Sequence, residues 1–202
     1  MTLASIHQAC ATVLQQLTVR RLSQSAERMS MVWNGDGLEI PFFDRIYRAT
    51  ANKIMTADGH SPTEAVVLAV GRYILQFPAG DIPLGPRVTF RELSGAGPLV
   101  ASFANNTNKL IAGTFAADIK KLEDRCRRMS CRPEFQSNGF DLSASFAAFP
   151  KVPLYLQFNA ADDLFPAQAT LLFHTSAEHY LDMQTLFILG TYLAGRLVSQ
   201  RL

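Results

Sequence analysis

The spacing of apolar residues predicts helices at both ends of the chain and between them. Positions 3–22 repeat apolar residues every three or four positions, which is the period of an amphipathic helix. Residues 182–200 are apolar on most sides, and this pattern indicates a helix packed in the core. Three more helices are expected, at about residues 61–77, 99–112 and 116–129, with Gly113 between the last two.

The helix expected at residues 61–77 has the clearest signals. Ser61 is suited to cap it, Pro62 suits the first helical position, and Glu64 completes a capping box. Gly71, in the middle of the segment, lowers helix propensity and indicates close packing against a neighbour.

Apolar runs and turn signals predict a first block of strands after the N-terminal helix. A glycine-rich turn at residues 34–37 suits a hairpin, because glycine adopts positive φ without strain. The strands expected around and after this turn cover residues 29–33, 38–42, 45–50 and 53–56.

A second block of strands follows the central helices. A short strand or turn is expected at Val88–Leu93, inside a connection rich in proline and glycine. Because strands and helices occur in blocks, we predict an α+β fold with a mainly antiparallel sheet, packed helices and a helix at each terminus. The later strands are expected at residues 139–146, 152–158 and 168–174, and a turn-rich loop at residues 159–166 joins the last two.

Composition limits the classes of function. The 202 residues suit one domain (1–202), with an N-terminal helical segment (1–28) and an α+β body (29–202). Lys and Arg number 19 against 17 Asp and Glu, and this near-neutral balance argues against a nucleic-acid partner. No apolar run reaches the roughly 18 residues of a membrane span, and the N-terminus lacks a signal-peptide pattern. Three cysteines are too few for a disulfide framework, so we expect free thiols in a soluble cytoplasmic protein of a bacterium or archaeon.

Four short motifs, in order along the chain, resemble those of one family. Val88–Leu93 with Gly95 is similar to an "FRELPGG" segment, and Phe149–Leu154 is similar to an "FPRVPL" strand. Asp162–Pro166 resembles an acidic "DEEFP" loop, and Leu171–His174 begins a segment that resembles an "LFD…YL" ending. The family is the uncharacterised prokaryotic domain of unknown function 3786, and the resemblance covers residues 29–198.

The chain also departs from this family pattern. Leu164 stands where an acidic residue is usual, His174 where Asp is usual, and Ala96 interrupts the usual glycine pair. Some family members carry an iron–sulfur domain like that of corrinoid iron–sulfur proteins, so the resemblance implies a link to corrinoid or one-carbon metabolism. This chain has no cluster-type run of cysteines, and its sequence identifies no cofactor.

Acidic residues form the first candidate site. Asp162 and Asp163 lie between two expected strands, and Glu178 and Asp182 follow soon after. Carboxylates that are brought together bind a hard cation or shift one another's pKa for acid–base work. The alternative is a solvated loop followed by a helix that Asp182 caps.

Arg91 and Glu92 form the second candidate site. Arg91 suits bidentate binding of a carboxylate or phosphate. The alternative is that both charges pair with other residues and fix the connecting segment to the domain.

His174 is the third candidate. Together with His179 it has a spacing found in some zinc sites, and Cys126 with Cys131 would complete a Cys2His2 set. The gap between the two pairs is much longer than in a compact zinc finger, so we expect no metal site and a histidine that ends a strand.

Phenylalanines are concentrated in the C-terminal half of the chain. They are either core residues or the lining of a pocket for a flat apolar ligand such as a tetrapyrrole. The seven residues concerned are Phe135, Phe140, Phe146, Phe149, Phe158, Phe165 and Phe173.

The resemblance and the absence of a catalytic motif favour a non-catalytic binding or accessory module linked to corrinoid or other tetrapyrrole metabolism, with a small molecule or a protein as partner. One alternative is an enzyme that uses Asp162 and Asp163, with Arg91 as an anion clamp. Another is a purely protein-binding subunit. The residues expected to bind a ligand are Arg91, Glu92, Asp162, Asp163 and His174.

Overall fold

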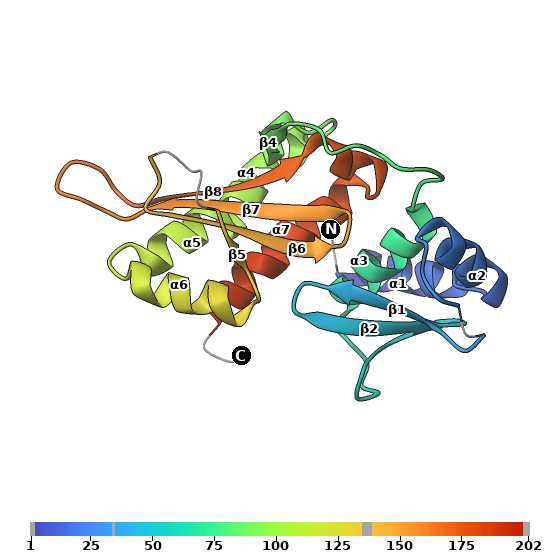
Figure 1. Cartoon of the computed structure of the whole chain (residues 1–202). Helices are drawn as coiled ribbons and strands as arrows, with labels where there is room; N and C mark the ends of the chain where they lie inside the picture. The colour runs from blue at the N-terminus through green and yellow to red at the C-terminus, as the bar shows by residue number, and fades with distance from the viewer. Residues whose placement is uncertain (1–2, 34, 135–138, 200–202) are drawn as a thin grey trace.

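The computed structural model describes residues 3–33, 35–134 and 139–199. The fold is α+β, with antiparallel sheets and a helix near each end of the chain, as the sequence predicts. Figure 1 shows a smaller sheet from the N-terminal half lying beside a larger sheet from the C-terminal half. No helix in the described part of the chain is long and apolar enough to cross a membrane.

The N-terminal half packs three helices around an antiparallel sheet of order β1-β2-β3. The three strands have the bounds that the sequence predicts, because each pairs across a tight turn with the next. The helices are α1 (Leu3–Gln16), α2 (Val19–Arg28) and α3 (Glu64–Gln76), and the strands are β1 (Leu38–Phe42), β2 (Arg45–Thr50) and β3 (Lys53–Thr56).

The first predicted helix is in fact two helices. The chain turns at Leu17 and Thr18, and the Thr18 hydroxyl accepts a hydrogen bond from the Arg21 amide at 3.3 Å. This side-chain cap starts a new helix, which the apolar spacing alone does not reveal.

The strand predicted at residues 29–33 is wrong. Helix α2 continues to Arg28 and ends in a turn where Ser30 has φ +53°, so these residues have no strand partner in the described chain. Asn34, in the predicted turn, lies outside the described residues.

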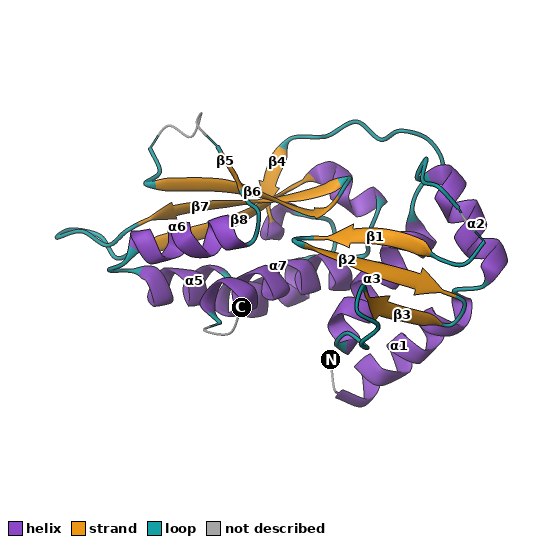
Figure 2. Cartoon of the chain, turned by 60° about the horizontal axis from the view of Figure 1, so that its bottom comes forward, coloured by secondary structure: helices purple, strands orange, loops and turns teal. Residues whose placement is uncertain are grey.

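The larger sheet has the strand order β4-β8-β7-β6-β5, and every neighbouring pair is antiparallel. Figure 2 shows helices α5, α6 and α7 along one face of this sheet. The strands are β4 (Arg87–Thr89), β5 (Arg132–Pro133), β6 (Leu142–Phe149), β7 (Val152–Asn159) and β8 (Gln168–His174). The helices are α4 (Val100–Asn106), α5 (Asn108–Phe115), α6 (Ile119–Arg128) and α7 (Met183–Val198), with short 3-10 helices η1 (Phe90–Glu92), η2 (Gly97–Leu99) and η3 (Thr175–His179).

Strand β6 begins and ends three residues later than the segment 139–146 predicted for it. Gly139, at φ +96°, still belongs to a turn, so the pairing with β7 starts only at Leu142.

The helix predicted over residues 99–112 breaks at Thr107 rather than near Gly113. Thr107 is fully buried, and its hydroxyl donates to a carbonyl one turn back at 2.6 Å. The next side chain, Asn108, accepts a hydrogen bond from the Leu171 amide of β8 at 3.2 Å. The break is therefore set by contacts with the sheet rather than by the glycine.

Helix α3 begins at Glu64, so the capping box predicted from Ser61 is wrong. Thr63 is the residue before the helix, and its side chain makes no capping hydrogen bond within the described chain. The Glu64 carboxylate instead lies 2.7 Å (Oε1 to Nδ1) from His7 of α1. A contact between two helices thus replaces the local one.

Helix α1 packs on α3 through Gly71. A Cβ atom at this position would lie 2.2 Å from Val13 Cγ1, which is too close for any side chain. The close packing predicted for Gly71 is therefore confirmed, and it explains why a residue of low helix propensity occupies the middle of α3.

Aromatic side chains join the two sheets into one continuous core. Tyr73 of α3 stacks on Phe149 of β6, with ring centroids 4.1 Å apart. Phe42 of β1 lies 4.9 Å from the Phe149 ring. The main chains also meet, because the Phe43 amide donates to the Ala148 carbonyl at 3.1 Å.

Most of the phenylalanines of the C-terminal half are core residues rather than the lining of a pocket. Phe146, Phe149, Phe158 and Phe173 are each at most 1% exposed. Phe140 and Phe165 are exposed. Phe135 lies outside the described residues.

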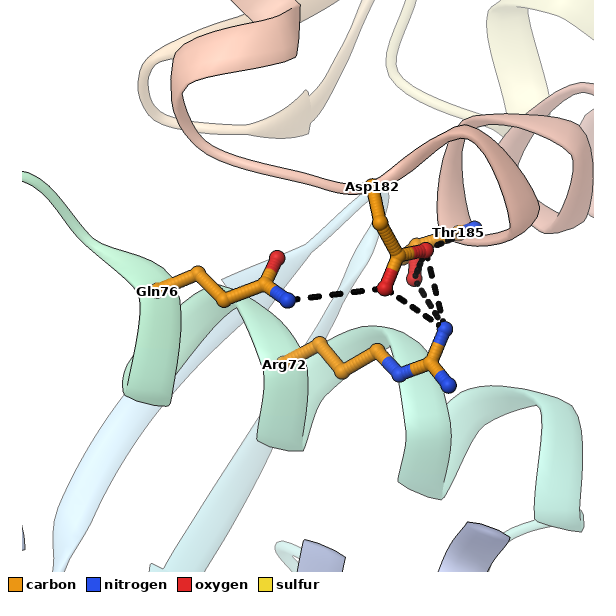
Figure 3. Close-up of polar contacts among 4 residues, drawn as sticks. All are labelled: Arg72, Gln76, Asp182 and Thr185. Carbon is orange, nitrogen blue, oxygen red and sulfur yellow. Dashed lines mark hydrogen bonds and ion pairs between the residues drawn. The ribbon is translucent and has the colours of Figure 1, made fainter. Parts of the chain in front are cut away.

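Polar contacts fix the start of α7 against α3 (Figure 3). The Arg72 guanidinium lies 2.8 Å from Asp182 Oδ2 and donates to the Thr185 hydroxyl at 3.2 Å. Asp182 also caps α7, as predicted, by accepting a hydrogen bond from the Thr185 amide at 2.8 Å. Gln76 adds a longer contact of 3.4 Å to the same carboxylate. One aspartate therefore caps a helix and anchors it to a second helix.

Replacing Asp182 by Ala should destabilise the protein, because the substitution removes the cap of α7 and leaves Arg72 without its carboxylate. We expect a loss of about 2 kcal/mol in the free energy of unfolding, measured by urea denaturation. Asp81→Ala is the matched control, because the Asp81 side chain is 81% exposed and pairs with Lys151 at the surface. Equal losses in the two variants would contradict the role given to Asp182.

Candidate functional site

The loop between β7 and β8 carries the acidic candidates and projects beyond the end of the larger sheet (Figure 1). Asp162 Oδ1 accepts hydrogen bonds from the amides of Leu164 at 2.8 Å and Phe165 at 2.7 Å. These two donors hold the pKa of the exposed Asp162 carboxyl below its ordinary value of 3.8. Asp162 therefore caps its own turn, and Asp163 beside it is exposed.

The Glu92 carboxylate likewise binds a residue close to it in the chain. Its Oε2 accepts hydrogen bonds from the amide and the hydroxyl of Thr89, each at 2.7 Å, and these contacts lower the pKa of Glu92. The two residues form a capping box for η1, and the Thr-x-x-Glu spacing is a sequence signal for it. Arg91 is exposed and makes no hydrogen bond or ion pair with the described chain.

The His174 side chain connects β8 to β7 and to the segment before β4. Its Nδ1 is hydrogen-bonded to the Gly85 carbonyl, and its Nε2 lies 2.8 Å from the Tyr155 hydroxyl. Because a carbonyl only accepts, Nδ1 carries the proton and Nε2 accepts from Tyr155. The Arg87 guanidinium lies 3.6 Å above the Tyr155 ring and binds Glu134 at 2.8 Å. His174 is thus held from both sides inside a structural network.

The acidic loop and His174 lie at opposite ends of β8, which spans Gln168–His174, so the structure does not bring these two parts of the predicted site together. The two aspartates are in the projecting loop, the Arg91–Glu92 pair is in η1 after β4, and His174 is at the end of β8. Across residues 3–33, 35–134 and 139–199, no group of three or more His, Cys, Asp or Glu is placed to hold a metal ion.

The structure gives Asp162 and Asp163 different roles, and amide exchange should separate them. In Asp162→Ala the amides of Leu164 and Phe165 lose their acceptor, so both should exchange faster in hydrogen-exchange NMR. In Asp163→Ala, the matched control, both exchange rates should stay as in the parent protein. Unchanged exchange in Asp162→Ala would show that the turn does not depend on the carboxylate.

A cleft of about 870 Å³ lies between helices of the two halves. Helix α7 lines it with Gln184, Ile188, Thr191 and Gly195, whose spacing places them on one helix face. Helices α1 and α3 line it from the N-terminal half, and α4 and α5 line it from the C-terminal half. Small-molecule sites are typically clefts of roughly 300–1,000 Å³, so this one suits a large ligand.

Polar side chains in the cleft are largely satisfied within their own helices. The Asn106 side chain donates to the Ser102 carbonyl at 2.8 Å, and the Thr191 hydroxyl donates to the Phe187 carbonyl at 3.0 Å. A ligand therefore meets a surface that is apolar in character and has few unmet hydrogen bonds.

The charge of the cleft is low. Glu64 is the one charged residue among its described lining residues, and its carboxylate faces His7. Leu110, 39% exposed, is an apolar side chain that the cleft leaves open to solvent. The cleft thus offers apolar contacts and no basic partner for an anion.

A polar hollow of about 450 Å³ borders this cleft, because Thr63 lines both. The Tyr47 hydroxyl is hydrogen-bonded to Tyr192 there, and burial together with that neighbour raises the pKa of Tyr47 to about 12. The charged and titratable residues that also line the hollow are Arg45, Asp58, His60, Tyr192 and Arg196. Hydroxyl and guanidinium donors therefore lie at one edge of the apolar cleft.

Sequence reasoning did not find the cleft. Helix α7 looks uniformly apolar, yet Gln184, Thr191 and Gly195 recur on one face among its apolar residues. This stripe of polar and small residues on α7 is the sequence pattern that could have indicated the cleft. The opposite lining comes from four other helices, whose arrangement is set by tertiary contacts.

Comparison with known proteins places the chain in a family without assigning an activity. The model of the domain of unknown function (DUF3786) matches residues 21–196. Searches of curated proteins and of solved structures found no match. Since the family match spans far more than half of the 202 residues, the chain belongs to the DUF3786 family.

Proposed function

We propose that this protein is a non-catalytic binding module whose ligand occupies the cleft between α3, α4 and α7. The observation that carries the proposal is the cleft itself, which has a volume of about 870 Å³, a largely apolar lining and polar groups that are mostly hydrogen-bonded within their own helices. Such surface exposed to water favours burial against an apolar ligand.

The charge of the lining favours a ligand with a neutral body. With Glu64 as the one charged lining residue, the described cleft has no cation to pair with the propionates of a haem. A corrin ring carries uncharged amides where haem carries propionates, so it needs no cation in the cleft. The corrinoid class itself rests on the family resemblance.

The two alternatives have less support. An enzyme built on Asp162 and Asp163 with Arg91 has less support because Asp162 already accepts two hydrogen bonds within its own turn. A protein-binding role has one observation in its favour, since Leu164 and Phe165 are 83% and 63% exposed in the projecting loop. The three free thiols support the expected cytoplasmic location.

Titration with aquocobalamin, followed by ultraviolet–visible spectroscopy, tests the proposal. We expect a spectral change that saturates at micromolar concentrations. Gly195→Phe should weaken binding at least about tenfold, or 1.4 kcal/mol, because a Cβ there meets no protein atom within 4 Å and the ring fills the cleft.

Gly113→Phe is the matched control. Gly113 also lies in a helix, α5, with nothing within 4 Å of its Cβ, but it does not line the cleft. This variant should bind aquocobalamin as the parent does. Haem, titrated in parallel, should bind more weakly. No cobalamin binding, or equal binding by both phenylalanine variants, would refute the proposed site and ligand class.

A further inference from the structure

Cys126 and Cys131 lie where the chain reverses at the end of α6. The Cys131 amide donates to the Cys126 carbonyl at 3.2 Å, and the Ser130 amide donates to the Arg127 carbonyl at 3.0 Å. With Ser130 in the left-handed region at φ +54°, these two bonds form a Schellman motif. Such a motif brings the side chains of its first and last residues together, and here both are cysteines.

The two thiols lie close enough for each to shift the pKa of the other. A disulfide requires Cα atoms about 4.4–6.8 Å apart. The hydrogen bond from the Cys131 amide to the Cys126 carbonyl keeps the two main chains, and with them the Cα atoms, close together.

The pair is asymmetric in exposure and in acidity. Cys126 is 2% exposed, whereas Cys131 is half-buried and open to small reagents. The hydrogen bond from Cys126 and the nearby Arg127 guanidinium lower the pKa of Cys131 to about 7. The same hydrogen bond and burial raise the pKa of Cys126. Cys131 is therefore the nucleophile, and Cys126 keeps its proton.

The third cysteine offers an internal comparison. Cys10 is 6% exposed, and its thiol donates to the Glu64 carbonyl at 3.3 Å. Burial raises the pKa of Cys10 to about 11. It therefore lacks both the exposure and the thiolate character that make a cysteine reactive.

We propose that Cys126 and Cys131 are a redox-active dithiol, which a peroxide converts to an intramolecular disulfide and which small thiols restore. The Cys131 thiolate attacks one peroxide oxygen, the O–O bond breaks, and Cys131 becomes a sulfenic acid while the second oxygen leaves and is protonated to water. The Cys126 sulfur then attacks the Cys131 sulfur. An S–S bond forms, and the sulfenic hydroxyl leaves with the Cys126 proton as a second water. Two electrons and two protons pass from the thiols to the peroxide.

The proposal is tested on the full chain in a Cys10→Ala background, which leaves only the pair. The reduced protein is treated with one equivalent of hydrogen peroxide without oxygen. We expect both titratable thiols to disappear, the mass to fall by two hydrogen atoms, and dithiothreitol to reverse both changes. Alkylation of Cys131 by iodoacetamide should show a midpoint near pH 7, because its pKa is about 7.

Two variants separate the roles of the cysteines. Cys131→Ser, at the half-exposed position, should leave Cys126 reduced under the same treatment. Cys126→Ser should stop the reaction at a Cys131 sulfenic acid, which dimedone captures as an adduct. The wild-type chain adds a third check, since Cys10 should stay reduced. Retention of both thiols in Cys10→Ala, disulfide-linked dimers in place of the intramolecular bond, or oxidation of Cys10 as fast as the pair would overturn the proposal.

Discussion

The placement of α7 is the constraint on which the rest of the structure depends. This helix comes last in the chain, yet ion pairs bind it at both ends to the N-terminal half. Asp182 at its start binds Arg72, and Arg196 near its end binds Asp44 through two contacts of 2.9 and 3.2 Å. Arg196 and Asp44 are only 15% and 16% exposed, so leaving either one unpaired in the folded protein is unfavourable. The two ion pairs therefore select one orientation of α7, while the apolar core supplies most of the stability.

The cleft follows from this orientation. Helix α7 packs against α3 of the N-terminal half and against α4, α5 and α6 of the C-terminal half. The face of α7 that carries Ile188 and Thr191 lies in the gap between α3 and α4. No described segment covers this face, so it forms a wall of the cleft. Gly190, on another face, lets the Phe103 ring of α4 approach, since a Cβ there would lie 2.4 Å from the ring. A glycine thus sets the spacing of α4, while Gly195 leaves open space in the cleft.

Local sequence patterns predicted those parts of the fold that are held by neighbours in the chain. The β1-β2-β3 meander and the β7-β8 pair have short connections, so apolar runs and turn residues were sufficient to predict them. The errors occur where distant contacts act. The break at Thr107 depends on the sheet, and the start of α3 depends on His7 of another helix.

Among the candidate site residues, Asp162 and Glu92 are residue types that are common in turns and caps, and the structure uses them there. The cleft lining comes from five helices, and no local pattern brings those together.

The two anchors of α7 also bear on the order in which the chain folds. Arg72 and Asp182 are 110 residues apart, and Asp44 and Arg196 are 152 apart. During synthesis on the ribosome, the N-terminal half emerges first, and Tyr73 and Phe42 lack the Phe149 ring until β6 has been made. Such late, long-range closure slows folding and leaves apolar surface exposed in the meantime. The N-terminal half is therefore the part of the nascent chain that most needs protection from aggregation before release.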